Sequence, residues 1–217
     1  MADSTISNDD ISAQLPEGAD VTLDQGSKGG NQLTVNKNVK GMEVTTTGGK
    51  TGVVGEKVTN TTISAQANKG DTDEIIVQAE GLYNSTIKNE GKGSISVTHN
   101  TGEFKNSVID AGSKKRADFV KFGNDAKLIK GTVNMGKGDD TVTVKRKVEF
   151  KKKTTVDLGI SGADKVVVQS KDGIQGGKLQ ITSFTKKDEL TIGKTTFDYK
   201  DIKGGADLPG NIKVDLA

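Results

Sequence analysis

The chain has 217 residues, of which 28 are Gly and only 31% are hydrophobic, which is less apolar mass than a compact core of this length normally holds. It contains no Cys, which excludes a disulfide framework and a thiolate-bound zinc ion. The 31 basic and 29 acidic residues leave a formal net charge of +2, so the overall charge gives no indication of a polyanion-binding protein.

The first 30 residues are polar, with few apolar positions. They hold neither a basic segment followed by an apolar one, as in a secretory signal, nor an apolar run long enough to cross a membrane. We therefore expect synthesis in a cytoplasm without a signal peptide, and no membrane partner. Residues 1–30 are predicted to form an extended polar arm or cap, in which Ile6, Ile11 and Leu15 are candidate anchors to a partner protein.

Residues 31–60 are predicted to form irregular first coils, and regular repetition begins near residue 61. Six segments have a β-branched residue at their centre, and successive centres are separated by 22 to 25 residues. The centres are Ile63, Ile87, Ile109, Val133, Val156 and Ile181. A fixed period of this length is typical of a repeat architecture in which each unit packs on its neighbours.

Two further apolar columns follow the first one within each repeat. The second consists of Val77, Val97, Val120, Val144, Val168 and Ile192, and the third of Leu82, Phe104, Leu128, Phe150, Ile174 and Phe197. Three short strands in each repeat of about 22–25 residues predict an all-β fold, a three-sided parallel β-solenoid over residues 61–202. Alternation such as that in residues 141–144 points apolar side chains inward. An antiparallel sandwich is the structural alternative, and residues 203–217 are expected to form a C-terminal cap or tail.

Aspartates recur in front of the second strand, each two residues before an apolar residue. They are Asp73, Asp118, Asp140, Asp164 and Asp188, with Ser94 in the same place in one intervening repeat. One interpretation is that these carboxylates accept hydrogen bonds from backbone N–H groups and fix the corner. The other is that calcium bridges successive coils. The first is favoured, because one Asp per coil supplies few of the roughly six to eight oxygens that Ca²⁺ takes.

Two glycine-rich segments precede strands in this part of the chain. Residues 136–144, GKGDDTVTV, and residues 158–164, LGISGAD, resemble the Gly/Asp nonapeptides of RTX-type secreted proteins. The resemblance implies calcium as a ligand, with Asp139, Asp140 and Asp164 as candidate ligating residues, and a secreted calcium-binding adhesin as one possible function. The chain lacks the tandem nine-residue repeats that supply the ligands in those proteins. No other metal or cofactor is predicted.

Groups that carry out catalysis are sparse in this sequence. His99 is the only histidine, and it is interpreted as an exposed turn residue without a catalytic role. Neither a G-x-S-x-G segment nor a phosphate-binding P-loop is present. A groove that cleaves polysaccharide usually offers aromatic platforms, whereas the chain has two Tyr and no Trp. We therefore predict no catalytic residues and no enzymatic activity.

The most basic segment is residues 145–153, KRKVEFKKK. Lys145, Arg146 and Lys147 are candidate partner-binding residues, and together with residues 114–116 of the preceding coil they would make a positive edge. A solvated loop face is the plainest interpretation, and docking to an acidic protein surface is the next. Nucleic-acid binding usually adds interleaved aromatic residues or an excess of positive charge, so no nucleic-acid partner is predicted.

The run from about Thr61 to Ile202 resembles the Gly/Asp/Thr/Val-rich β-solenoid proteins of virions. Tailed phages, notably those that infect marine cyanobacteria, carry such proteins as capsid knobs, fibres and appendages. The resemblance implies a non-enzymatic structural protein at the virion surface, a capsid knob or decoration held through its N-terminal arm. Its partners would be the major capsid protein or other virion proteins. The alternative is a receptor-binding tail fibre or appendage segment that contacts a host cell surface.

Overall fold

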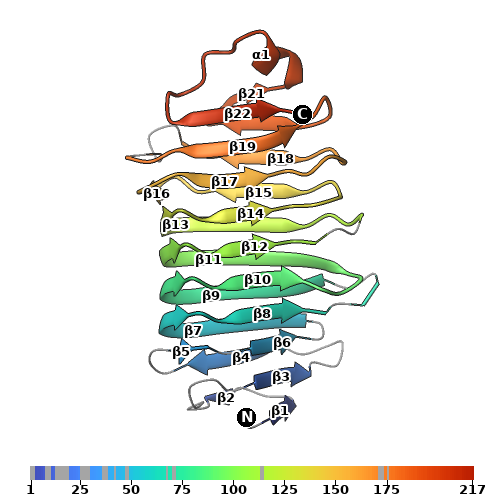
Figure 1. Ribbon diagram of the computed structural model, residues 1–217, viewed down its shortest axis with the longest axis vertical. Helices are drawn as coiled ribbons and strands as arrows, with labels where there is room; N and C mark the ends of the chain where they lie inside the picture. Colours follow the sequence, from blue (N-terminus) through green and yellow to red (C-terminus); the bar gives the residue numbers. More distant parts are fainter. Residues whose placement is uncertain are drawn as a thin grey trace.

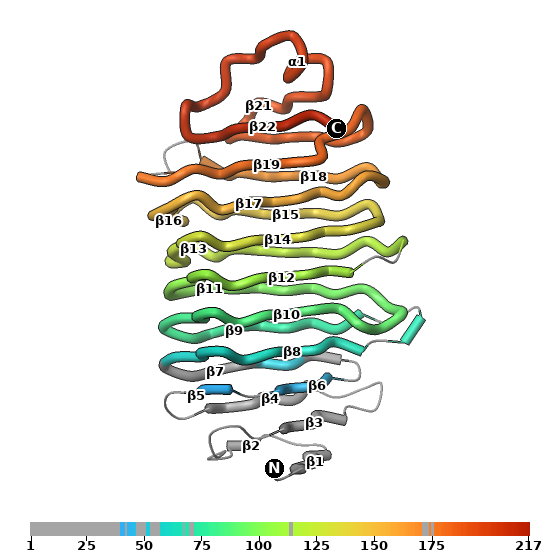
Figure 2. Tube along the Cα trace, in the orientation of Figure 1, coloured from blue at the N-terminus to red at the C-terminus, as the bar shows by residue number. Residues whose placement is uncertain are grey.

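The protein is a stack of parallel β-strands that rises from the N-terminus to the C-terminus, as the computed structural model shows in Figure 1. The structure describes residues 3–7, 11–12, 20–24, 30–35, 39–41, 43–46, 49–66, 68–69, 72–112, 115–170, 174 and 176–217. Coil follows coil along the long axis, so segments about 23 residues apart in sequence lie side by side (Figure 2). The predicted parallel β-solenoid is therefore confirmed.

Two sheets run the length of the stack. The strands of sheet one, in spatial order, are β1 (Asp3–Ser7), β3 (Asp20–Asp24), β6 (Glu43–Thr46), β8 (Thr62–Ala65), β10 (Thr86–Asn89), β12 (Val108–Asp110), β14 (Thr132–Asn134), β17 (Thr154–Asp157), β19 (Leu179–Phe184) and β22 (Ile212–Leu216). Those of sheet two are β2 (Ile11–Ser12), β4 (Gly30–Val35), β7 (Gly49–Thr59), β9 (Thr72–Tyr83), β11 (Ser94–Lys105), β13 (Phe119–Ile129), β15 (Thr141–Val144), β18 (Lys165–Val168), β20 (Glu189–Ile192) and β21 (Thr195–Phe197).

The second and third predicted strands of each repeat belong to one sheet. In the middle of the molecule they form one long strand, which changes register at a bulge between His99 and Thr101 of β11. Elsewhere the two parts are separate strands: β5 (Val39–Lys40) follows β4 and pairs with β7, and β16 (Glu149–Phe150) follows β15 and pairs with β13. A bulge bends a strand, which allows one long strand to supply two sides of the coil.

The row of sheet one that was predicted as the interior stack is confirmed. Ile63, Ile87, Ile109, Val133, Val156 and Ile181 pair with one another in that order. Each of them is at most 1% exposed. Their neighbours along each strand face outward, because successive side chains of a strand point to opposite faces. Repetition of the β-branched triplet therefore builds a continuous apolar column.

The second predicted column is wrong in register for two of its members. Val97 pairs with Ile75 and with Val120, and these residues lie in the row that continues through Val142 rather than in the row of Val77. The row of Val77 instead passes through His99, Phe122, Val144, Val168 and Ile192. Both rows are buried. Two inward rows two residues apart give the same alternating pattern, so the sequence did not distinguish them.

The third column is confirmed over four coils and ends differently from the prediction. Its members Leu82, Phe104, Leu128 and Phe150 are in register and are fully buried. Phe197 lies outside this column, in β21, which turns back and pairs antiparallel with β20.

The C-terminal end of the core is covered by a short cap. The helix α1 (Tyr199–Lys203) begins at Asp198, whose side chain accepts hydrogen bonds from the N–H groups of Lys200 and Asp201. Phe197, Tyr199, Ile202 and Leu208 pack against the core from this segment, which lies above β22 in Figure 1. Such a cap prevents the last coil from exposing its apolar interior. Among the described residues, no helix has the length and apolar character needed to span a membrane.

Both sheets extend into the range predicted as an N-terminal arm or cap. Strand β1 pairs with β3 in parallel register, and β3 pairs with β6. Strand β2 pairs with β4, which pairs with β7. The backbone pairing of the solenoid thus continues to these strands, and a role of residues 1–30 in attachment stays a prediction.

Candidate functional site: the aspartate corner

We define the aspartate corner as the set of loops that lead from sheet one into sheet two, all but one of which end at or near a buried acidic residue. In chain order, the loops that the structure describes in full or in part follow β8, β10, β12, β14, β17 and β19. Asp73, Asp118, Asp140, Asp164 and Asp188 are each 1% exposed. The predicted recurrence of aspartates therefore corresponds to one structural row at this corner.

Hydrogen bonds between successive coils connect this row. The N–H of Asp118 donates to Oδ1 of Asp140 (2.8 Å), and the N–H of Asp140 donates to Oδ1 of Asp164 (2.8 Å). The N–H of Asp164 donates to Oδ1 of Asp188 in the same way (2.9 Å). In each coil, the carboxylate thus satisfies the buried backbone donor of the coil before it, a group that costs free energy when it is left unpaired. This observation supports the structural interpretation of the aspartates.

The coil between those of Asp73 and Asp118 has no aspartate in this row, and Ile95 occupies the position that was predicted for Ser94. Ile95 pairs with Asp73 in sheet two, and its N–H donates to Oδ1 of Asp118 (2.7 Å). The predicted position was one residue off in this coil, in which the corner loop between β10 and β11 is shorter than the three loops that follow it. The hydrogen bond to the next coil survives there, since it needs only a backbone N–H.

Burial gives these carboxyl groups unusual proton affinity. Desolvation raises the pKa of Asp118 to about 7, although the hydrogen bond from the N–H of Ile95 acts in the opposite direction. Desolvation likewise raises the pKa of Asp140 and of Asp164 to about 7, and the neighbouring aspartates add to the increase. Oδ2 of Asp140 is buried without a hydrogen-bond partner. A carboxyl group of this kind changes its charge near neutral pH.

The glycines of the RTX-like segments allow successive coils to approach each other. Gly138 has φ +154°, and a Cβ built there would lie 1.6 Å from the carbonyl oxygen of Arg116 in the preceding coil. Gly162 has φ +134°, and its Cβ would lie 1.5 Å from the carbonyl oxygen of Gly138. No side chain fits at either position. The glycine pattern is explained by contacts between backbones.

The candidate calcium ligands are occupied with hydrogen bonds to the backbone. Oδ1 of Asp139 accepts from the N–H of Ala163 (2.8 Å), and Asp140 and Asp164 accept from N–H groups within the row. Within the described residues, no group of three or more His, Cys, Asp or Glu side chains could hold a metal ion. Calcium binding stays the less favoured of the two interpretations.

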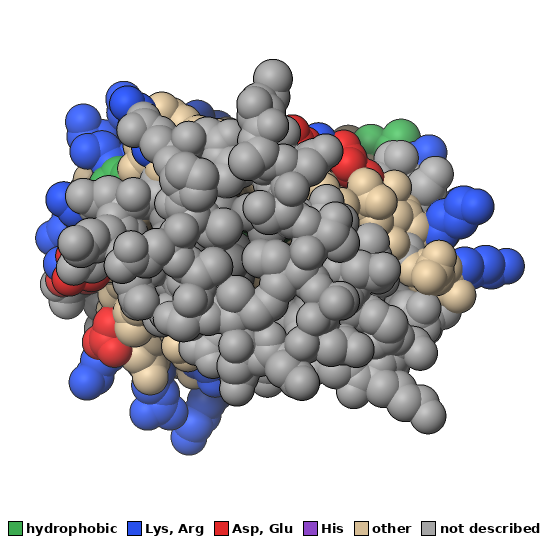
Figure 3. All heavy atoms as spheres, turned by 90° about the horizontal axis from the view of Figure 1, so that it is seen from below, with side chains coloured by type: hydrophobic (Ala, Val, Ile, Leu, Met, Phe, Trp, Pro, Cys, Tyr) green, Lys and Arg blue, Asp and Glu red, His purple; other side chains and the backbone are tan. Residues whose placement is uncertain are grey.

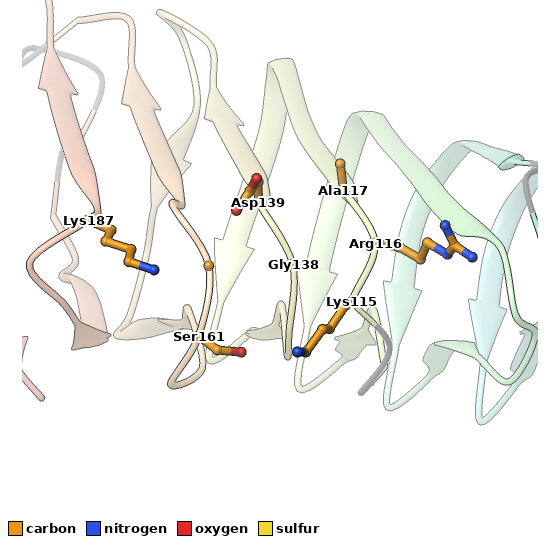
Figure 4. Close-up of a pocket in the computed structure, with 8 residues that line it drawn as sticks. Lys115, Arg116, Ala117, Gly138, Asp139, Ser161 and Lys187 are labelled. Atoms are coloured by element: carbon orange, nitrogen blue, oxygen red, sulfur yellow. The ribbon is translucent and has the colours of Figure 1, made fainter.

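A shallow depression of about 320 Å³ lies on the outer surface of this corner. It is lined by Lys115, Arg116, Ala117, Gly138, Asp139, Ser161, Gly162 and Lys187. Figure 4 shows the Lys115 and Lys187 side chains reaching toward each other from opposite ends, with Ser161 and Asp139 between them. Arg116 points away, and its Nε donates to the carbonyl oxygen of Lys92 (3.2 Å). Sequence reasoning did not identify this surface, although the spacing of the buried aspartates would have placed these residues at one corner.

The two basic segments that were expected to form one edge are not brought together. Residues 115–116 precede β13 at the aspartate corner, whereas Lys145, Arg146 and Lys147 follow β15 at the other end of this side of the coil. The strands between them separate the segments, so the predicted positive edge is wrong. Among the predicted anchors, Ile6 lies in β1 opposite Leu23 and Ile11 lies in β2 opposite Leu33. Leu15 lies outside the described residues.

His99 is not an exposed turn residue. It lies in β11, is 1% exposed, and packs against Phe104 and Phe122 with ring centroids 5.8 and 6.5 Å away. Burial lowers the pKa of His99 to about 4, although the hydrogen bond of its Nε2 with the Gly102 carbonyl oxygen (3.3 Å) acts in the opposite direction. The imidazole is therefore neutral at physiological pH and belongs to the core. The polar residues around it in sequence concealed its inward position.

No family model, curated protein or solved structure matches this chain.

Proposed function

We propose that this chain is a non-enzymatic structural protein of a virion surface, a capsid knob or decoration built as a β-solenoid. The observation that supports this role best is the regularity of the stack, in which the same interior rows and the same corner hydrogen bonds repeat from coil to coil. A surface component must keep its shape without a large core, and repetition meets this requirement because each coil adds apolar contacts and backbone hydrogen bonds.

The dimensions of the stack suit a projecting element. Sheet one has ten strands, and parallel neighbours lie about 4.8 Å apart, so the sheet extends for about 45 Å along the axis. Its C-terminal end is covered by Phe197, Tyr199, Ile202 and Leu208. A capped end of this kind can face solvent, because the apolar interior of the last coil is covered.

The chemistry of the described surface supports a role without catalysis. The only histidine is buried in the core. The depression at the aspartate corner holds lysines, one serine and one carboxylate, and its serine has no histidine beside it that could act as a base. A receptor-binding appendage remains the second candidate, because the same depression offers charged groups to an external ligand.

Attachment through the N-terminal end agrees with the order of the strands. Strands β1 and β2 begin the two sheets, so a partner strand that pairs with either one would extend the stack. Residues 1–43 also hold seven acidic and three basic residues, in contrast to the basic middle of the chain. A basic patch on a capsid protein would complement this end.

The test is to purify particles from an infected culture and to measure by mass spectrometry whether the chain co-purifies with the major capsid protein at a fixed ratio. Deletion of residues 2–30 is expected to abolish incorporation into particles, while circular dichroism still reports a β-rich fold. Lys145→Ala/Lys147→Ala serves as the comparison and is expected to be incorporated normally. Absence of the wild-type chain from purified particles would overturn the proposal. Normal incorporation of the deletion together with loss of the lysine variant would move attachment to the basic loop.

A further inference from the structure

The middle of the chain, and the aspartate corner within it, is rich in basic residues. Residues 105–187 hold 19 Lys and Arg against nine Asp and Glu, and of those nine, Asp118, Asp140 and Asp164 are buried. Lys and Arg side chains project on several sides of the molecule when it is viewed along its axis (Figure 3). At the corner, the described basic residues are Lys69, Lys92, Lys115, Arg116, Lys137, Lys186 and Lys187, and the described exposed acidic residues are Glu90 and Asp139.

These lysines are not neutralised by acidic neighbours. Ion pairs in the described part of the chain join Lys88 to Glu90, Lys151 to Glu149, Lys165 to Glu189 and Lys213 to Asp215. None of them involves Lys115 or Lys187. Basic residues on adjacent coils, such as Arg116 and Lys137, repel by up to about 1 kcal/mol per pair at the dielectric constant of water. A ligand with negative charges would remove this repulsion.

The depression arranges its polar groups along the axis of the solenoid. Lys115 precedes Asp118 and Lys187 precedes Asp188, so three coil steps of about 4.8 Å, roughly 14 Å in all, separate the two positions. Asp139 and Ser161 lie between the two lysines (Figure 4). A ligand that fits must be linear, must present negative groups to both lysines, and must offer hydrogen-bond donors to a carboxylate in between.

We infer that the depression between Lys115 and Lys187 binds a linear anionic glycan, with its carboxylate or sulfate groups on the two lysines and its hydroxyl groups on Asp139 and Ser161. Sugar hydroxyls donate to carboxylates and to serine oxygens, whereas the phosphodiester backbone of DNA carries no donor for Asp139. The described lining also lacks an aromatic side chain, on which the bases of a single strand would stack. The hydroxyl-rich chain therefore fits this surface better than nucleic acid does.

The experiment measures binding of the full-length protein by calorimetry to a polygalacturonate oligosaccharide, a sulfated oligosaccharide, a neutral dextran oligosaccharide, and single- and double-stranded oligonucleotides. We expect binding to at least one of the two anionic glycans and none to dextran. The two anionic glycans distinguish carboxylate from sulfate recognition. We also expect the affinity to fall as salt rises from low to physiological concentration, because exposed charges are screened.

The variant Lys115→Ala/Lys187→Ala is expected to weaken glycan binding by about tenfold or more, which corresponds to about 1.4 kcal/mol. The matched control is Lys145→Ala/Lys147→Ala, which removes the same charge at a different corner and is expected to change the affinity by less than about twofold. Circular dichroism and melting temperature establish that both variants are folded.

Three outcomes would overturn the inference. Equal losses in the two variants would show that binding follows the net charge. If neither anionic glycan binds, anionic glycans are excluded as the ligand. Tighter binding of an oligonucleotide, lost in Lys115→Ala/Lys187→Ala, would replace the glycan by nucleic acid. None of these results depends on whether the chain is found on virions.

Discussion

Two corners of the solenoid provide acceptors for buried backbone N–H groups, and they use different chemical groups to do so. At the aspartate corner, buried carboxylates accept N–H groups from the coil before them. At the corner that leads from sheet two back to sheet one, which we call the asparagine corner, hydroxyl groups do so: Ser85 Oγ accepts from the N–H of Thr61, and Ser107 Oγ accepts from the N–H of Ser85 (3.1 Å each). A hydroxyl is neutral at all relevant pH values, whereas a carboxyl group is charged unless it binds a proton.

The two corners also differ in how strictly their length is maintained. Over four successive coils, each turn of the asparagine corner has two residues: 60–61, 84–85, 106–107 and 130–131. The first residue of each has a positive φ: Asn60, Asn84, Asn106 and Lys130, between 48° and 56°. Asn tolerates this conformation better than most residues. The loops of the aspartate corner, in contrast, differ in length from coil to coil.

The difference indicates that the two corners have different roles. In these four coils, turns of constant length fix the register, since a one-residue slip would point every side chain to the opposite face. The variable corner carries the unpaired lysines and the surface depression, in keeping with the general tendency of loops to hold binding residues on a rigid scaffold. Four experiments test this comparison, from the largest expected effect to the smallest.

The first tests the apolar row that both corners position. Val133→Asp is expected to destabilise the fold by about 5 kcal/mol or more, because it places an unpaired charge between Ile109 and Val156 in a dry column. Urea unfolding followed by circular dichroism measures the change. Thr132→Asp, which lies on the outward face of the same strand, is expected to change stability by less than about 1 kcal/mol. Similar losses in the two variants would place Val133 outside the interior.

The second experiment uses pH to distinguish the carboxyl groups of the aspartate corner from the hydroxyl groups of the asparagine corner. The folded-state pKa of Asp118, Asp140 and Asp164 is about 7, well above the ordinary value of 3.8 for this group, so between these values the native state holds more protons than the unfolded state. Stability therefore falls as pH rises toward about 7, by up to about 1.4 kcal/mol per pH unit for each group. The free energy of unfolding, measured by urea titration from about pH 5 to about pH 8, is expected to be larger at the lower pH.

His99 acts against this trend at the acid end. Its pKa is lowered to about 4 from 6.5, so the native state holds fewer protons than the unfolded state between these values, and its contribution falls as pH falls. The range from about pH 6.5 to about pH 8 reports mainly on the aspartates. Stability that is constant or rises over that range would contradict the raised pKa values.

The third experiment compares two substitutions, each of which removes one hydrogen-bond acceptor at one of the two corners. Ser107→Ala leaves the buried N–H of Ser85 without its acceptor, and Asp140→Ala does the same to the N–H of Asp118. Each is expected to cost about 1–3 kcal/mol at about pH 5. At about pH 8 the cost of Asp140→Ala is expected to be smaller, because the variant also removes a buried charge, while that of Ser107→Ala is unchanged. Parallel pH profiles for the two variants would remove the distinction between the corners.

The fourth addresses calcium and is expected to give the smallest effect. Addition of a chelator is expected to shift the melting temperature by no more than a few degrees, because the Asp row is held by hydrogen bonds to the backbone. Differential scanning calorimetry with and without added calcium measures the shift. A large decrease that calcium reverses would restore the interpretation of Asp139, Asp140 and Asp164 as ligands.

The sequence alone determined the architecture and the main interior row. Repetition at 22 to 25 residues identifies the coil, and the β-branched residue at each centre, from Ile63 to Ile181, identifies the inward position of sheet one. Both are local properties, because the two-residue alternation of a strand and the spacing of its repeats are written directly in the chain. The recurring aspartates were visible for the same reason.

Only the tertiary structure decided which alternating residues share a row and what each corner does chemically. Val97 and His99 have the same parity, so the bulge in β11 and the lengths of the corner loops were needed to place them. Burial of His99, of Asp118 and of Asp140, and with it their shifted proton affinity, depends on how neighbouring coils cover them. The convergence of Lys115 and Lys187, some 70 residues apart in the chain, is likewise set by the stacking of coils, since no local pattern specifies which loops become neighbours across three turns of the solenoid.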